Sequence, residues 1–137
     1  MNRRNFIQVV SAGTLFGLLG VKNSSASEDQ FGAGSFYYTE KSPGRWHQKV
    51  AGHIPHFEVS GESLKIVTGH EMNGYEHYIV KHQLFDQNFN LIAEKMFDPV
   101  RDKAAVSIHP LSGLSGKIYA VSVCNKHDNW VNSLNLT

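Results

Sequence analysis

Cysteine is almost absent from this sequence, since its 137 residues contain only one, Cys124. A disulfide within the chain is therefore excluded. An excess of either charge is also missing, because 13 Lys and Arg stand against 12 Asp and Glu. Without a basic patch, we expect no nucleic-acid partner. Only one long apolar run is present, at the N-terminus, so we expect no membrane anchor in the mature chain.

The N-terminus has the features of a removable export signal. Arg3 and Arg4 precede an apolar stretch, residues 9–21, that is too short to span a bilayer. Small residues at 24–26 offer a cleavage site. The order resembles a twin-arginine signal peptide, so we predict a signal over residues 1–26 and a periplasmic mature protein. The alternative is a surface helix that stays on the protein.

Export makes a lone cysteine unusual, because oxidising compartments favour paired thiols. Such a thiol is buried, paired with another chain or bound to a metal. The twin-arginine route carries proteins that have already folded, so a metal could be loaded in the cytoplasm, where ferrous iron is available. We therefore weigh a metal-bound Cys124 against a buried free cysteine beside a surface histidine.

The remaining chain has the pattern of an all-β protein. Residues 27–45 are rich in Gly and Ser with aromatic residues interspersed. They predict either an N-terminal arm that docks on the domain or on a neighbouring subunit, or a disordered tail. Residues 46–137 contain short apolar or alternating runs separated by turn signals, with no convincing helix. The expected strands are His56–Val59, Ser63–Thr68, Tyr78–Phe85, Phe89–Phe97, Ala104–Ile108, Gly116–Val123 and Val131–Leu136. This pattern predicts a seven-stranded immunoglobulin-like antiparallel β-sandwich.

Eight histidines are many for this length, and four lie where a rigid scaffold presents ligands. His53 precedes the first strand, His70 and His77 flank the loop before the third, and His127 follows Cys124. Four imidazoles in a plane with sulfur on the axis suit ferrous iron. Zinc prefers four ligands in a closed tetrahedron. The spacing leaves planarity open, so a three-ligand zinc or copper site is the competing interpretation. The other histidines have no partner at a useful spacing and are expected to be ordinary: His47, His56, His82 and His109.

Three motifs resemble the iron site of superoxide reductases, the neelaredoxin and desulfoferrodoxin family. They are Gly52–Pro55, the segment from His70 to Ile79, and Cys124–His127 with Trp130. The resemblance covers residues 46–137 and implies a superoxide reductase-like iron-binding domain with an immunoglobulin-like sandwich. It implies one Fe(II)/Fe(III) centre, of the one-iron type because no further cysteine is present. The implied ligands are four equatorial nitrogens and one axial sulfur, from His53, His70, His77, His127 and Cys124.

The resemblance also implies an activity, the one-electron reduction of superoxide to hydrogen peroxide, with Cys124 as a catalytic ligand. Turnover needs an electron donor, which for an exported protein would be an unidentified periplasmic one, rubredoxin-like or a cytochrome. Two other functions stay open: a non-catalytic iron or copper electron-transfer or metal-binding protein, and a sulfur-compound carrier. The carrier is disfavoured, because such proteins bear their cysteine on a flexible Gly-rich tail. A homo-oligomer is compatible with the aromatic arm.

The sequence departs from the family at three places. The family commonly has Glu-Lys before the first ligand histidine, where this chain has Ala51–Gly52. Lys49, or Glu40–Lys41 in the arm, is the candidate to take those roles. His70 and His77 are seven residues apart instead of six, so we expect an extra residue to bulge out at Asn73–Gly74. The residue after His127 is usually glycine and is Asp128 here, a residue that tolerates a left-handed conformation.

Overall fold

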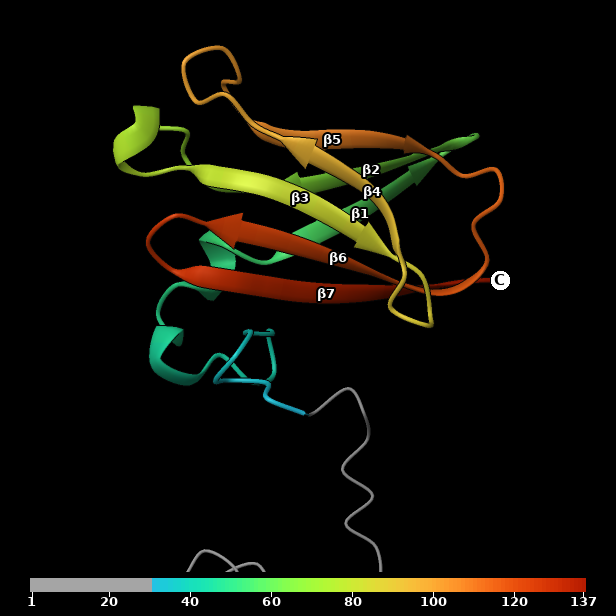
Figure 1. Cartoon of the computed structure of the whole chain (residues 1–137), viewed down its shortest axis with the longest axis horizontal. Helices are drawn as coiled ribbons and strands as arrows, with labels where there is room; N and C mark the ends of the chain where they lie inside the picture. The colour runs from blue at the N-terminus through green and yellow to red at the C-terminus, as the bar shows by residue number, and fades with distance from the viewer. Residues whose placement is uncertain (1–30) are drawn as a thin grey trace, which may run out of the picture. The chain divides into compact units, whose positions relative to one another are not determined.

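A computed structural model of the chain describes residues 31–137, and the predicted signal peptide, residues 1–26, lies outside them. Seven antiparallel strands form two facing sheets, one in the order β1-β2-β5 and the other in the order β4-β3-β6-β7 (Figure 1). The predicted all-β, seven-stranded sandwich is confirmed. The strands are β1 Pro55–Ser60, β2 Ser63–Thr68, β3 Ile79–Phe85, β4 Leu91–Met96, β5 Ala105–Pro110, β6 Gly116–Cys124 and β7 Asp128–Leu136.

Helix is limited, among the described residues, to single 3-10 turns: η2 Gly44–Trp46, η3 Val50–Gly52 and η4 Gly74–Glu76. None of these turns has the length or apolar character needed to cross a membrane.

Two strands begin more than one residue away from the start that the sequence pattern predicts. β4 begins at Leu91 instead of Phe89, because Phe89 has a φ of +62° and belongs to the turn. The Asp86 carboxylate holds that turn by accepting hydrogen bonds from the backbone N–H groups of Asn88 and Asn90, at 2.8 and 2.9 Å. β7 begins earlier than predicted, at Asp128, because its first residues continue the ladder with the end of β6.

The main core lies between the two sheets. The alternation in β2 turns Leu64 and Ile66 inward, and both are fully buried. They pack against Leu84 of β3 and Ile118 and Ala120 of β6. Burial of a large aliphatic side chain contributes roughly 1.5–3 kcal/mol, so this cluster stabilises the sheet-to-sheet contact.

A smaller cluster attaches the N-terminal segment to the sandwich. Tyr38 pairs with the outer edge of β7 through two backbone hydrogen bonds, Tyr38 N–H to the Asn129 carbonyl at 2.9 Å and Val131 N–H to the Tyr38 carbonyl at 2.8 Å. Its ring packs on Trp130, with centroids 5.6 Å apart, and both residues are buried. Part of the predicted arm is thus packed against the end of the domain that the next section describes.

Candidate metal centre

The strand pairing gathers five strand ends at one end of the sandwich. The start of β1 pairs with the end of β2, Pro55 opposite Thr68. The start of β3 pairs with the end of β6, Ile79 opposite Cys124. Cys124 also lies opposite Asp128, the first residue of β7. Loops that precede β1, follow β2, precede β3 and connect β6 to β7 therefore meet at this end.

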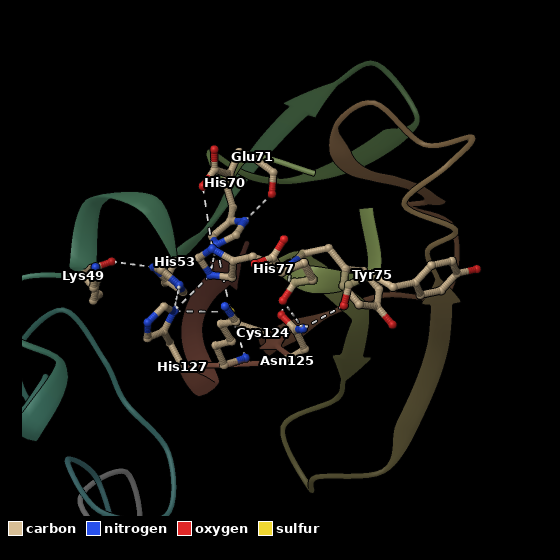
Figure 2. A network of polar contacts seen from close by, with 12 residues as sticks. Lys49, His53, His70, Glu71, Tyr75, His77, Cys124, Asn125 and His127 are labelled. Atoms are coloured by element: carbon tan, nitrogen blue, oxygen red, sulfur yellow. Dashed lines mark hydrogen bonds and ion pairs between the residues drawn. The ribbon is translucent and has the colours of Figure 1, made fainter. Parts of the chain in front are cut away.

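Each of these five strand ends, or the loop residues next to it, supplies one candidate ligand. The five donor atoms lie within 4.8 Å of one another and point toward a common centre (Figure 2). They belong to the five residues that the sequence singles out, His53, His70, His77, Cys124 and His127.

The other four histidines of the described chain lie outside this cluster. His47 and His56 are exposed. His82 and His109 are buried within the sandwich and hydrogen-bond to hydroxyl groups, His82 to Thr68 and Ser107, and His109 to Ser107.

The four imidazoles are arranged around a ring. His53 Nε2 is 3.1 Å from His127 Nδ1, which is 3.2 Å from His77 Nε2, which is 3.1 Å from His70 Nε2. The ends of this series, His53 and His70, have ring centroids 4.6 Å apart. A square with such edges has its centre about 2.2 Å from each corner, close to the ~2.0–2.1 Å of a metal–imidazole bond.

The sulfur lies to one side of this ring. Cys124 Sγ is 3.5 Å from His127 Nδ1 and 3.9 Å from His70 Nε2. These nitrogens occupy opposite corners, and a single atom can approach both only from above or below the ring. Four nitrogens around a centre with sulfur on the axis therefore describe the donor arrangement.

Hydrogen bonds on the outer ring nitrogens aim the donor atoms inward. His53 Nδ1–H donates to the Lys49 carbonyl at 2.8 Å, and His70 Nδ1–H donates to the Glu71 carbonyl. His77 Nδ1 lies 3.6 Å from the Glu71 carboxylate. With protons held on Nδ1, the Nε2 atoms of His53 and His70 present lone pairs to the centre. Converging lone pairs about 3 Å apart repel one another unless a cation lies between them.

Burial keeps these groups in the protonation state that a metal needs from nitrogen. Burial lowers the pKa of His53 to about 4, and it lowers the pKa of His70 and of His127 as well. These three imidazoles are therefore neutral at pH 7. Burial raises the pKa of the Cys124 thiol, and hydrogen bonds from the backbone N–H groups of Lys126 and His127 offset part of this rise. A bound metal would displace the thiol proton, because thiolate is the ligating form.

Apolar side chains shield one side of the sulfur from solvent. Cys124 is 4% exposed and packs with Ile79, Phe97 and Ala105. The Lys126 backbone N–H points at the sulfur, with N and Sγ 3.5 Å apart. His70, His77 and His127 are only half-buried, so the side of the ring away from the sulfur is the more open one.

Lys49, the predicted substitute for the missing family lysine, lies beside the centre. Its carbonyl holds His53, and its ammonium charge contributes to the lowered pKa of both His70 and His127. Glu40 and Lys41 are exposed residues of the arm. The loop after His70 turns at Gly74, which has a φ of +55°, within the predicted Asn73–Gly74 pair.

Sequence reasoning missed two residues around the centre. Trp46 places its ring edge against His127, with centroids 4.8 Å apart at 86°. Glu71 contacts two ligand candidates, through its carbonyl and its carboxylate. Glu71 could have been found from its position directly after His70. Trp46 carries no such signal, because it meets His127 only through the fold.

An immunoglobulin-like sandwich that carries four histidines and one cysteine at one end is the class of protein that this fold and site define. Solved structures with a similar fold include superoxide reductases. The neelaredoxin of Ignicoccus hospitalis is 23% identical over 74% of this chain and 94% of its own, with a TM-score of 0.61. The one-iron superoxide reductase of Giardia intestinalis is 25% identical over 62% of this chain and 98% of its own, with a TM-score of 0.54.

No family model matches the sequence, and no curated protein does. The chain thus has a superoxide reductase-like fold with a His4Cys cluster at the position where its sequence resembles that family's iron site.

Proposed function

We propose that this protein binds one iron ion through His53, His70, His77, His127 and Cys124 and reduces superoxide to hydrogen peroxide. The observation that carries the proposal is the convergence of four imidazole nitrogens and one sulfur within 4.8 Å. Four imidazoles and a thiolate suit an ion of intermediate softness such as ferrous iron. Five donors exceed the four of a closed structural zinc site.

Iron bound there would supply one electron to superoxide, which leaves as hydrogen peroxide after taking up two protons. The chain provides an approach for the anion on the more open side of the ring, away from Cys124. Lys49 and Lys126 place positive charge near the centre, since the ammonium groups of both contribute to the lowered pKa of His127. Positive charge at the mouth of a site raises the rate at which an anion arrives.

Cys124 and its neighbours set how strongly sulfur donates electron density. The Lys126 N–H shares the sulfur lone pairs, and such hydrogen bonds tune donation to a metal. Burial among Ile79, Phe97 and Ala105 keeps water from competing for the sulfur. Substitutions of the residues that make these contacts should therefore change how strongly the sulfur donates.

Metal content and the visible spectrum test the proposal. We expect the purified protein to contain about one iron per chain and, when oxidised, to show a thiolate-to-iron(III) charge-transfer band in the red. Cys124→Ser should abolish the band and lower superoxide consumption by an order of magnitude or more. A colourless, zinc-filled wild type, or an iron-loaded wild type that does not consume superoxide, would contradict the proposal.

The second candidate is a non-catalytic iron or copper protein for electron transfer or metal binding. Ala51–Gly52 favours it, because the Glu-Lys pair of the family is absent from these positions. This candidate predicts a metal-loaded protein with a reversible one-electron couple and no superoxide consumption above that of free metal, so the same assay separates the two.

Export and partners complete the proposal. Arg3 and Arg4 support export by the twin-arginine route to the periplasm. Replacing both by Lys should leave the protein in the cytoplasmic fraction, and an unchanged periplasmic fraction would overturn the assignment. Turnover consumes one electron per superoxide, so a periplasmic donor is required, rubredoxin-like or a cytochrome.

A further inference from the structure

Residues 38–46 of the N-terminal segment contact Asp128, the residue that follows the candidate ligand His127. The Asp128 carboxylate, next in sequence to His127, accepts two hydrogen bonds at the same oxygen, Oδ2. One comes from Arg45 Nη2 at 2.5 Å and the other from Trp46 Nε1 at 2.8 Å. Arg45 Nε also donates to the Tyr38 hydroxyl at 3.2 Å. Two side chains of the segment from 38 to 46, Arg45 and Trp46, thus converge on one carboxylate, and Tyr38 contacts Arg45.

The backbone at Asp128 gives this carboxylate a special position. Asp128 has a φ of +64°, in the left-handed region, which residues other than glycine adopt rarely. Glycine would meet the backbone requirement better, so the conformation does not account for an aspartate here. The contacts of its carboxylate with Arg45 and Trp46 account for the aspartate.

The same segment supports two of the four imidazole rings. Trp46 packs edge-on against His127, with centroids 4.8 Å apart. Trp130 lies 5.5 Å from the His53 ring and donates Nε1–H to the His127 carbonyl at 2.8 Å. Tyr38 covers Trp130. An aromatic layer held by residues 38–46 therefore fixes one side of the nitrogen ring.

We propose that residues 38–46 form a structural part of the metal centre, with Asp128 as the latch that fastens them beside His127. Asp128, Arg45 and Trp46 are positioning residues, which act on the metal through the orientation of His127 and His53. The inference rests on the proposed metal site but not on the proposed reaction. It predicts that loss of the latch speeds metal release and alters the metal's spectrum while the sandwich stays folded.

Asp128→Gly tests the latch, because glycine keeps the left-handed backbone and removes only the carboxylate. Full-length protein is loaded with Fe²⁺, and release into excess bipyridine is followed by the colour of the iron–bipyridine complex. We expect release about tenfold faster than in wild type, the size of effect seen when a support of a metal ligand is removed. Arg45→Ala should act in the same direction but less, because Trp46 still bonds the carboxylate. The double variant should release iron no faster than Asp128→Gly alone.

Lys65→Ala is the matched control, because it breaks an exposed ion pair with Glu58 between β1 and β2, outside the cluster. It should release iron at the wild-type rate and leave the red band of the oxidised protein in place, whereas Asp128→Gly should shift that band. Thermal unfolding of the metal-free proteins checks that each variant is folded, and Arg45→Ala, at an exposed position, serves if Asp128→Gly is not.

The outcomes separate the latch from the function. Wild-type release rates and spectra in both latch variants would overturn the latch and leave the proposed function untouched. Faster release together with an iron-loaded wild type that does not consume superoxide would support the latch and contradict the reaction. A wild type that binds no iron would overturn both.

Discussion

His82 lies in the middle of the sandwich, fully buried, and joins both sheets through hydroxyl groups. Its Nε2 is 2.8 Å from Thr68 Oγ1 in β2, and its Nδ1 is 2.9 Å from Ser107 Oγ in β5. The Thr68 hydroxyl donates to Ser122 in β6 at 2.8 Å, so its oxygen accepts from His82 Nε2–H. His82 Nδ1 is then the acceptor for the Ser107 hydroxyl. The neutral ring satisfies both contacts without placing a charge in the core.

Burial lowers the pKa of His82 to about 4, with a smaller contribution from His109. In the unfolded chain a histidine has a pKa of about 6.5, so the unfolded state binds the proton first as the pH falls. The stability that neutral His82 provides is therefore complete above pH ~6.5 and is lost between pH ~6.5 and ~4, by up to about 1.4 kcal/mol per pH unit.

We predict that His82→Gln is less stable than wild type at pH 7, by about 1–3 kcal/mol, because buried hydrogen bonds are lost. Its free energy of unfolding should fall less steeply between pH 6.5 and 4. Urea unfolding of the metal-free proteins at several pH values measures both effects. His56→Gln, at an exposed position of β1, should follow the wild-type curve. Equal slopes for wild type and His82→Gln would show that His82 is not the group responsible.

Among the loops, the segment between β2 and β3 carries two candidate ligands and is held in part by the side chain of Asn125. Asn125, next to Cys124, donates Nδ2–H to the carbonyls of Tyr75 and Glu76, at 3.3 and 3.0 Å. Its Oδ1 accepts from the Tyr78 backbone N–H at 3.0 Å (Figure 2). These bonds fix both sides of His77, which itself pairs with Asn73 across the turn.

We predict that Asn125→Ala loosens this loop and with it His77. Asn125 is exposed, so water replaces the lost bonds, and the free energy of unfolding should fall by only about 1 kcal/mol. Iron release to a chelator should nevertheless become several-fold faster, because His77 loses its fixed orientation. Asn135→Ala, at the opposite end of β7, is the control and should change neither quantity. A destabilised Asn125→Ala that still holds iron as tightly as wild type would contradict the role in positioning.

The strands and the five donors could be predicted from the sequence because both depend on local signals. Alternating runs and turn residues set β2 and β6, and the histidines lie where those runs stop. The contacts of the N-terminal segment could not be predicted in this way. Trp46 and Asp128 are 82 residues apart, and only the folded chain brings them together. The predicted start of β4 was wrong because no sequence signal indicates that Phe89 has a left-handed backbone conformation.

At the scale of the whole molecule, the net charge is small, and the positive charge that matters for an anion lies near the metal centre. The chain has a formal net charge of only +1, so its overall field neither attracts nor repels an anion strongly. Lys49 and Lys126 act at the centre itself, both lowering the pKa of His127. Lys49 also lowers the pKa of His70. Attraction of superoxide should therefore depend on these two cations more than on the remaining surface.

We predict that Lys49→Met lowers the second-order rate constant for superoxide by about two- to fivefold at low ionic strength, because one cation near the metal centre is lost. The difference should shrink as salt rises, since exposed charges beyond about 10 Å are screened at 0.1 M. Stopped-flow rates of the iron-loaded protein at several ionic strengths measure both effects. Lys117→Met is the control, because Lys117 lies seven residues before Cys124 on β6, about 23 Å along the strand. If Lys49→Met and Lys117→Met share the wild-type rate and salt slope, Lys49 does not replace the lysine that Ala51–Gly52 lacks, and Lys126 is the remaining cation to test.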